Sequence, residues 1–380
     1  MQSKELQKSP SKERINTLDS LRGLAALTVV LAHTTYGFMR APIIKYTPLY
    51  LAITGHEAVV FFFILSGYVL IYRYRSNLTY NYGSFLMQRF FRIYVPYIVS
   101  FFIALALLRL STPVLPNNDY ISGMWHITVT FKDVIKHLIA IGNYNTSVVN
   151  PVIWSLVHEM RIAIIFPLLL FVVDLSLSRT LLLMAFTTIV SVILIGFNVT
   201  YTLGFNNSYG HTVYYFYMFT AGGLAAKFKE QLARQYVSLS TLQRSFLLII
   251  VLLIYNYDNL LSNFFAPLHI PGLLKSTISD TVIDFFTVLA SLYFIVAAVS
   301  LKGTNNFLTG KPAQFLGKIS YSLYLIHLPV TAFIYFLLYG KTPIYVTLSV
   351  GFITSILLSV VFNKYVEQKS KLLFYKKNIA

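Results

Sequence analysis

Apolar segments long enough to cross a bilayer recur along almost the whole chain, and they constrain its architecture. A membrane-spanning helix needs about 20 mostly apolar residues, because the hydrocarbon core is about 30 Å thick and each helical residue rises about 1.5 Å. Ten segments approach or reach this length, and the sixth and seventh are the shortest; they cover residues 17–38, 57–72, 85–107, 151–173, 181–197, 213–226, 246–257, 282–300, 319–338 and 344–362. We therefore predict an all-α polytopic membrane bundle of about ten helices.

The distribution of basic residues gives the bundle an orientation. The chain is 56% hydrophobic and only 11% charged, whereas soluble domains carry about 25% charged residues. If the N-terminus is cytoplasmic, only seven of the 30 Lys and Arg residues fall in outer loops, namely Arg40, Lys45, Arg109, Lys132, Lys136, Lys275 and Lys341. This asymmetry follows the positive-inside rule, so it predicts a multi-pass protein of a bacterial-type cytoplasmic (inner) membrane with both termini in the cytoplasm. The rule also explains the net charge of +17 without nucleic acid as a partner.

Several chemistries are excluded by residues that the chain lacks. It has no cysteine, which excludes disulfides, a thiolate nucleophile and Cys-ligated zinc. No Gly-x4-Gly-Lys loop occurs, so nothing suggests ATP-driven pumping. We expect no metal, and the sequence does not indicate an oligomeric state. The expected organisation is a cytoplasmic tail at 1–15, a transmembrane domain at 16–367 and a basic cytoplasmic tail at 368–380.

The longest outer connection, residues 111–150, has its own pattern. The apolar spacing of residues 131–139 predicts a short amphipathic helix at the membrane interface. Either a lid over a site or a passive cap would explain it.

The first apolar segment carries ionisable residues on one face. Asp19, Arg22, Ala26 and His33 recur at steps of three, four and seven, so they share one side of a helix. Arg22 and His33 are about three turns apart, or about 16 Å. A charged Arg inside a bilayer is retained when it is paired or functional. The structural alternative is that Arg22 reaches the inner surface while His33 bonds a neighbouring helix.

Five motifs in order resemble one known family. They are Leu-Asp-x-Leu-Arg-Gly-x-Ala at 18–25 followed by His33, Phe-Phe-x-Leu-Ser-Gly-Tyr at 62–68, Arg-x-x-Arg-x-x-x-Pro at 89–96, Trp-Ser-Leu-x-x-Glu at 154–159, and Ser-Tyr-x-x-Tyr-Leu-x-His-x-Pro at 320–329. Together they resemble the membrane acyltransferase 3 family from residue 16 to residue 367, in the stand-alone form without a fused hydrolase-like domain. Two departures occur: Met160-Arg161 replace an aromatic pair, and Gln368-Lys369 stand where the family has x-Pro after Glu367.

The resemblance implies a function and a set of site residues. The activity would be transfer of an acyl group, most often acetyl, from cytoplasmic acyl-coenzyme A to a hydroxyl of a cell-surface carbohydrate or lipid-linked glycan. Arg22, Arg89 and Arg92 would bind the phosphates of the donor. His33 would act as general base or carry the acyl group briefly, and Glu159, with Glu57 as a second group, would orient it.

The remaining candidates are the supporting residues Ser66, Trp154, Tyr321 and His327, and most candidates have a structural alternative. Arg89 and Arg92 also fit ordinary cytoplasmic anchors, and His56 with Glu57 fits an interfacial pair. Trp154 suits an interface anchor or a sugar-stacking platform, whereas Tyr321 and His327 suit a hydrogen-bonded helix seam.

Two other functions compete with acyl transfer. A transporter of a small organic acid could use the same buried His and Glu residues. Against it, the sequence shows no inverted repeat and no span pair broken by Gly or Pro. A structural membrane partner without chemistry is disfavoured by the buried charges.

Overall fold

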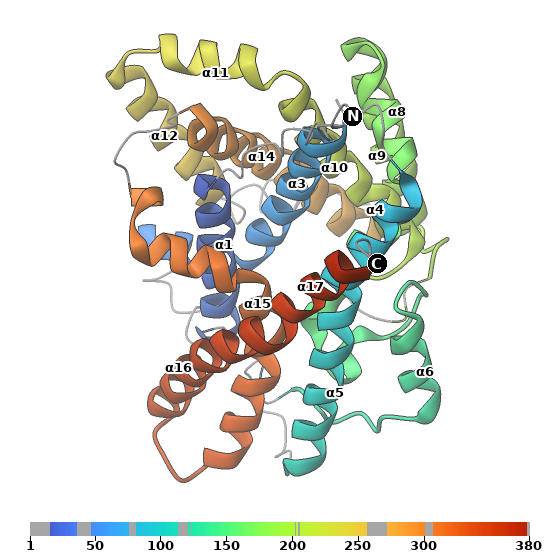
Figure 1. Cartoon of the computed structure of the whole chain (residues 1–380), viewed down its shortest axis with the longest axis vertical. Coiled ribbons are helices and arrows are strands. Elements are labelled where there is room, and N and C mark those ends of the chain that lie inside the picture. The colour runs from blue at the N-terminus through green and yellow to red at the C-terminus, as the bar shows by residue number, and fades with distance from the viewer. Residues whose placement is uncertain are drawn as a thin grey trace, which may run out of the picture.

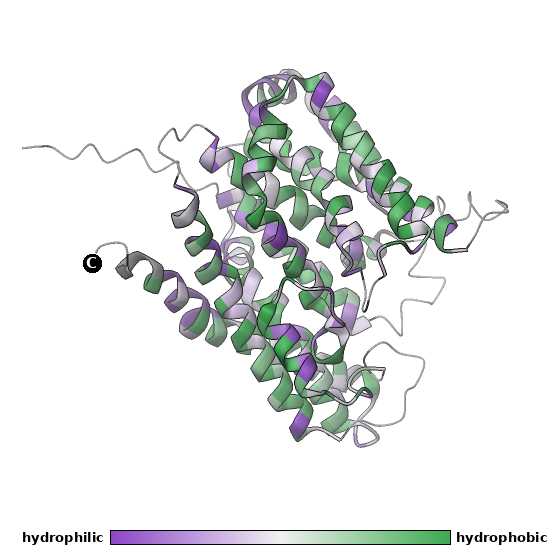
Figure 2. Cartoon of the chain, turned by 90° about the vertical axis from the view of Figure 1, so that its right-hand side faces the viewer, coloured by the Kyte–Doolittle hydropathy of each residue, from purple (hydrophilic) through white to green (hydrophobic). Residues whose placement is uncertain are grey.

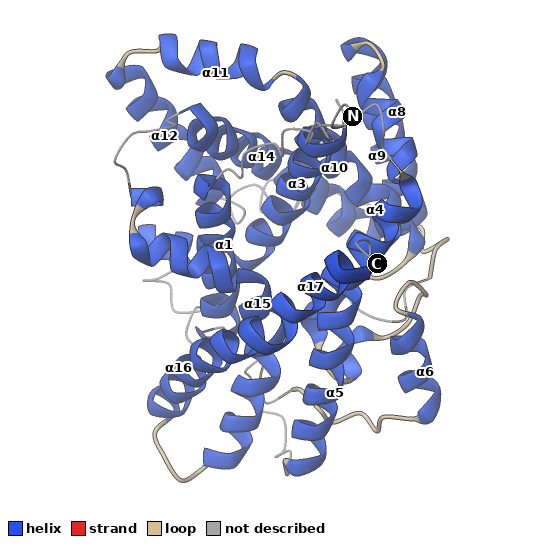
Figure 3. Ribbon diagram, in the orientation of Figure 1, coloured by secondary structure: helices blue, strands red, loops and turns tan. Residues whose placement is uncertain are grey.

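The structure is a computed structural model, and it describes residues 16–35, 47–75, 81–112, 121, 123–201, 203, 206–256, 272–300 and 307–377. The predicted tail 1–15 lies outside these residues. The described residues contain helices and no strand (Figure 3). The main helices are α1 (Asn16–Thr35), α3 (Gly55–Tyr74), α4 (Tyr82–Arg89), α5 (Val95–Leu110), α6 (Phe131–Ile139), α7 (Trp154–Ile164), α8 (Phe166–Asp174), α9 (Leu177–Gly196), α10 (Tyr209–Lys227), α11 (Lys229–Ser238), α12 (Thr241–Asn256), α14 (Gly272–Ser300), α15 (Lys311–Leu338), α16 (Ile344–Phe362) and α17 (Gln368–Lys377).

The chain is a polytopic helical membrane bundle, as predicted. Within the described residues, six helices are long and apolar enough to cross a membrane, and two bent helix pairs raise the number to eight if each pair is one span. Apolar residues cover most of these helices in Figure 2. The helices α1 and α10, which the sequence also predicts as spans, are not among the eight. The count of ten therefore stays a prediction.

The two bent pairs correct the expectation that no span is broken. The helices α7 and α8 meet at 69°, and α11 and α12 meet at 115°. Pro167 lies in the first turn of α8, where it cannot donate a hydrogen bond to the preceding turn, and so it ends α7. At the second break, the Ser240 backbone N–H donates to the Gln243 side chain while the Gln243 N–H donates to the Ser240 hydroxyl, a reciprocal cap that starts α12.

Glycines bring the central helices into backbone contact. The helix α1 packs along α15 (Figure 1), and a Cβ on Gly23 would lie 2.3 Å from the Gly317 nitrogen. The helix α3 packs along α10 in the same way, because a Cβ on Gly67 would lie 2.0 Å from the Phe219 carbonyl oxygen. Small residues permit such close approach in membranes.

Two π-helical turns interrupt the long helices. One covers Phe90–Tyr94, between α4 and α5, and the other covers Asn363–Glu367, between α16 and α17. Pro96 lies just after the first π-helical turn. Because proline has no backbone N–H, the Arg92 carbonyl lacks the donor that residue 96 would provide in a regular α-helix. Such turns often occur at functional sites.

The predicted amphipathic helix is present as α6, with the predicted bounds. Thr130 and Asp133 form a capping box at its start. The hydroxyls of Tyr94 and Tyr97 donate to the backbone carbonyls of Leu138 and His137, which attaches α6 to α5. Burial lowers the pKa of the His137 imidazole below its ordinary value. These hydrogen bonds therefore hold α6 in a fixed position against α5.

Candidate active site

Two histidines from the central helices meet in the interior. His33 near the end of α1 and His327 of α15 stack with ring centroids 5.2 Å apart, and His33 Nδ1 lies 3.0 Å from His327 Nε2. His327 is fully buried. The structure thus joins the predicted base with a residue that the sequence assigned only to a supporting role.

The hydrogen bonds of His327 determine which nitrogen of His33 carries a lone pair. His327 Nδ1 lies 3.0 Å from the Leu323 carbonyl oxygen and 2.9 Å from that of Tyr324, so this nitrogen carries the proton and donates. His327 Nε2 is then an acceptor, and His33 Nδ1 donates to it. The resulting tautomer of His33 has its lone pair on Nε2, as a general base requires.

Arg22 lies on the same interface, nearer the start of α1. Its Nε donates to the Ser320 hydroxyl over 3.0 Å, and its Nη2 donates to Asp19 over 2.8 Å. Ser320 precedes His327 on α15 by seven residues, and Arg22 precedes His33 on α1 by eleven. Arg22 and His33 therefore both face α15, in agreement with their predicted common helix face.

Arg89 and Glu159 form an ion pair. Arg89 Nη1 lies 3.7 Å from Glu159 Oε1, and the side chains are 10% and 20% exposed. Glu159 thus balances the charge of Arg89, and its predicted role of orienting His33 stays a prediction. The Arg89 Nε atom is buried without a partner among the described residues, so its N–H can still donate to an anionic ligand.

Tyr321 lies close to several charged side chains. Its hydroxyl donates to the Ile93 carbonyl, within the first π-helical turn, over 2.9 Å. Arg92, Glu159 and Glu367 all act electrostatically on Tyr321. Arg92 forms no ion pair within the described part of the chain. Arg89, Arg92 and Glu159 thus gather beside α15, which is where the resemblance expects the donor phosphates.

Lys371 is a member of this cluster that the sequence did not reveal. Its ammonium group lies 2.6 Å from Glu367, whose carboxylate also accepts from Ser322 and Asn363. Arg92 and Arg22 are close enough to repel its charge. The second π-helical turn positions Glu367. Lys371 falls in the predicted basic tail at 368–380, so it was not expected in the site.

Two further predicted residues occupy the second membrane helix. Ser66 is half-buried on α3, next to the close contact made by Gly67. Glu57 is buried in the first turn of α3. Its neighbour His56 bonds Asp284 of α14 over 2.7 Å, and the other oxygen of Asp284 accepts from Tyr214 over 2.8 Å. The sequence suggested a pair of His56 with Glu57, whereas the ion pair that the structure gives for His56 is with Asp284.

Trp154 serves packing rather than the interface. It is 7% exposed, and it lies 6.1 Å from the ring of Phe63 and 5.6 Å from that of Tyr215. Arg161 lies two residues after the motif at 154–159. Its guanidinium group donates to the Thr212 hydroxyl and to four backbone carbonyls, those of Ile141, Gly142, Asn207 and Ser208. Arg161 therefore attaches the segments around residues 141–142 and 207–208 to α7.

Tyr324 of α15 completes the contact with α7. Its hydroxyl lies 2.7 Å from the Ser155 hydroxyl and donates to the Val152 carbonyl over 2.9 Å. The motif at 320–329 thus joins α15 to α1 through Ser320 and His327 and to α7 through Tyr324. The helix seam expected for this motif is present, and it holds the His33–His327 pair in place.

Among the described residues, no group of three or more His, Asp or Glu side chains could hold a metal ion.

One family model and two known proteins are similar to this chain in sequence. The family model described as "Acyltransferase domain", of the acyltransferase 3 family, matches residues 15–364. The chain is 38% identical over 111 residues to "Protein 2 in picA locus" of Rhizobium radiobacter, covering 27% of this chain and 53% of that protein. It is 29% identical over 161 residues to "Acyltransferase MdmB" of Streptomyces mycarofaciens, covering 42% and 40% of the two chains. The chain therefore matches about half or less of the length of these relatives, and no solved structure matches it. Because the family model covers nearly the whole sequence, the chain belongs to the acyltransferase 3 family.

Proposed function

We propose that this chain is a membrane O-acyltransferase that moves an acyl group, most often acetyl, from cytoplasmic acyl-coenzyme A to a hydroxyl of a carbohydrate or lipid-linked glycan. One observation carries the proposal: the α1–α15 interface holds Arg22 and the histidine pair in line, about 16 Å apart along α1. A polyanionic donor fits the cationic end of this line, and an acceptor hydroxyl fits the end with the base. Family membership supports the same reaction.

The cationic end suits the phosphates of coenzyme A. Planar guanidinium groups bind phosphate with two parallel hydrogen bonds, and each charge-assisted bond contributes about 1.5–3 kcal/mol. Arg92 has no ion-pair partner among the described residues, and the buried Arg89 Nε has no acceptor. Lys371 adds a third cation on the same side. Arg22 would then meet the part of the donor that enters furthest into the bundle.

The reaction needs one proton acceptor and no further reagent. His33 Nε2 removes the proton of the acceptor hydroxyl as its oxygen attacks the thioester carbonyl. A carbon–oxygen bond forms, the carbon–sulfur bond breaks, and the proton returns from His33 to the departing thiolate. His327 is a positioning residue in this scheme, because it holds the His33 tautomer through the 3.0 Å contact.

The test measures transfer of labelled acetyl groups from acetyl-coenzyme A to surface glycans in membranes that contain the chain. His33→Gln keeps a hydrogen-bonding side chain but cannot take up a proton, so we expect a loss of about 10²–10⁴-fold. His126→Gln is the matched control, because His126 is exposed on the outer loop. Near-native transfer by His33→Gln would remove His33 from the chemistry. Absence of labelling by the native chain in membranes with several glycan types would refute the proposed reaction.

A transporter of a small organic acid is the second candidate. The proline-linked break between α7 and α8 favours it, because discontinuous spans often line transport sites. The two functions differ in their dependence on coenzyme A. Uptake or efflux of acetate by vesicles that lack coenzyme A would favour transport, whereas acylation that stops without the donor would favour transfer.

A further inference from the structure

A large apolar pocket lies on the side of the bundle formed by α9, α10, α11 and α14. Its volume is about 1030 Å³, and ligand pockets usually measure about 300–1,000 Å³. Its wall is made almost entirely of aliphatic and aromatic side chains, among them Ala221, Ala225 and Leu292. An empty cavity of this size would be costly, because its lining would lose dispersion contacts.

The pocket is elongated along α14. The residues of α14 that line it lie on one face from Thr281 to Val296, a distance of about 22 Å. The hydrocarbon of one leaflet is about 15 Å thick, half of the bilayer core. The pocket is therefore long enough to hold an alkyl chain over the depth of a leaflet, and its surroundings are membrane-spanning helices.

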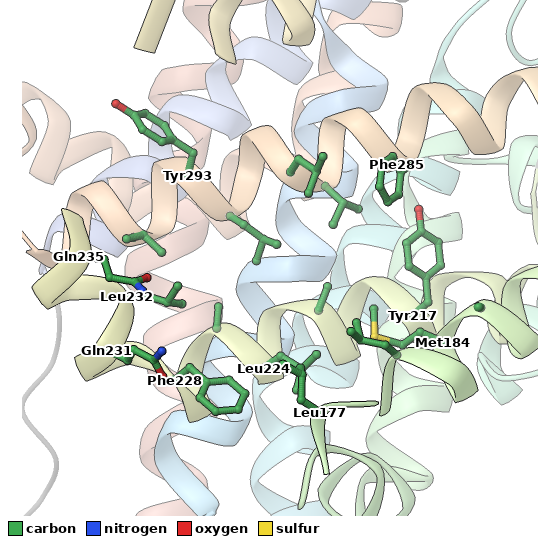
Figure 4. Close-up of a pocket in the computed structure, with 18 of the residues that line it drawn as sticks. Leu177, Met184, Tyr217, Leu224, Phe228, Gln231, Leu232, Gln235, Phe285 and Tyr293 are labelled. Carbon is green, nitrogen blue, oxygen red and sulfur yellow. The ribbon is translucent and has the colours of Figure 1, made fainter. Parts of the chain in front are cut away.

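Both ends of the pocket carry polar side chains, but their surroundings differ. Figure 4 shows Gln235 and Tyr293 at one end and Tyr217 and Phe285 at the other. At the first end, the rings of Tyr236 and Tyr293 lie 5.9 Å apart. This end lies beside α11, on the side that the distribution of basic residues predicts to be cytoplasmic. A lipid head group would therefore lie at this end.

Arg244 supplies a positive charge at this polar end. Its guanidinium group lies 5.3 Å from the ring centre of Tyr236, and the Tyr293 hydroxyl donates to its backbone carbonyl over 3.0 Å. One guanidinium nitrogen donates to the Val237 carbonyl, but Nε is buried without a partner among the described residues. Arg244 also lies in the first turn of α12, where the helix dipole is positive. A buried donor without an acceptor beside an apolar pocket indicates an anionic ligand.

We propose that this pocket binds one anionic phospholipid of the cytoplasmic leaflet, with an acyl chain along α14 and the phosphate at Arg244. The proposal rests on the pocket alone and does not depend on the proposed transfer reaction. The acyl donor is a poorer occupant, because the cationic cluster of Arg89, Arg92 and Lys371 lies beside α15, whereas Arg244 contacts the lining residues Tyr236 and Tyr293.

The experiment compares phosphatidylglycerol with phosphatidylcholine of the same acyl chains. Purified full-length protein is titrated with each lipid in detergent, and bound lipid is counted by native mass spectrometry. We expect phosphatidylglycerol to bind the native protein about ten-fold more tightly, because both lipids offer a phosphate to Arg244 but the choline cation of phosphatidylcholine offsets its attraction to the guanidinium group. Equal affinities for the two lipids would overturn the assignment of an anionic head group.

Variants separate the head-group contact from the chain contact. Arg244→Gln should remove the preference for phosphatidylglycerol, whereas Arg234→Gln, on the exposed side of α11, should keep it. Ala225→Phe should fill the pocket and weaken both lipids about ten-fold, and Phe186→Trp, on the exposed side of α9, should not. Unchanged binding by Ala225→Phe would place the lipid elsewhere.

A photoreactive phosphatidylglycerol gives a second measurement on the unmodified protein. Crosslinks should map to α9, α10 and α14 if the acyl chain occupies the pocket. Crosslinks confined to α5 or α16 would overturn the proposal. None of these measurements uses acyl transfer, so they remain informative if the proposed function fails.

Discussion

A single methyl group at Gly23 should separate the two helices that hold the candidate active site. A Cβ at Gly23 would lie 2.3 Å from the Gly317 nitrogen, about 1.1 Å short of the 3.4 Å at which ordinary contact begins. The obstacle is backbone rather than a flexible side chain, so α1 and α15 must move apart by about that amount. Overpacking of this kind usually costs about 1–3 kcal/mol of stability.

The movement would also break the contacts that define the site. Arg22 Nε and the Ser320 hydroxyl are 3.0 Å apart, as are His33 Nδ1 and His327 Nε2. A separation of about 1 Å puts both pairs beyond hydrogen-bond distance. Misplacement of catalytic groups by about 1 Å can cost about 10²-fold in rate. We therefore expect Gly23→Ala to lower acetyl transfer by about 100-fold.

Acetyl transfer and thermal unfolding in the same detergent preparation test this reasoning. The matched control is Gly272→Ala at the start of α14, because a Cβ there meets nothing within 4 Å. This control should be as active as the native protein and slightly more stable, since Ala favours helix by about 1 kcal/mol. Native turnover by Gly23→Ala would show that the close helix contact does not hold the active geometry.

Three further predictions follow from the contacts. His327→Phe should lower turnover about 10–100-fold, because the His33 N–H loses its buried acceptor. His327→Gln should lose less in the transfer assay, and equal losses would assign His327 to packing alone. Arg92→Ala should raise the KM for acetyl-coenzyme A about ten-fold with little change in thermal stability, since Arg92 has no ion pair among the described residues; an unchanged KM would make it a membrane anchor. Because the chain has no native cysteine, a cysteine at exposed Val199 should react with an impermeant thiol reagent in intact cells, and one at Gln235 should not; the reverse pattern would invert the topology.

Sequence patterns predicted the fold well, because hydrophobic length and helical spacing are local properties. The α6 helix has the predicted bounds, and Arg22 and His33 share the face that packs on α15. Pairing between distant helices was not predictable in the same way. The ion pair of Glu159 with Arg89 was not predicted, because helix periodicity fixes direction around one helix but not the neighbour that it faces.

Irregular backbone explains most of what the sequence did not reveal. A π-helical turn inserts a residue and rotates all later side chains, and Lys371 follows such a turn in the predicted basic tail. The break between α7 and α8 was not predicted, although the sequence contains Pro167 at that point. Asn207 falls in an outer loop, yet it is fully buried and donates to the Tyr144 carbonyl. For that reason Val199 is the better position for surface labelling.

The separation in sequence between α1 and α15 has a consequence for biosynthesis. The two paired histidines are 294 residues apart, so at about 5–20 residues per second the ribosome needs roughly 15–60 s to make the second after the first. During that interval Arg22 and His33 are in the nascent chain before Ser320 and His327 exist. The contact between α1 and α15 is therefore completed late, when α15 is inserted beside α1, and a truncated nascent chain that ends before α15 should lack the His33–His327 contact.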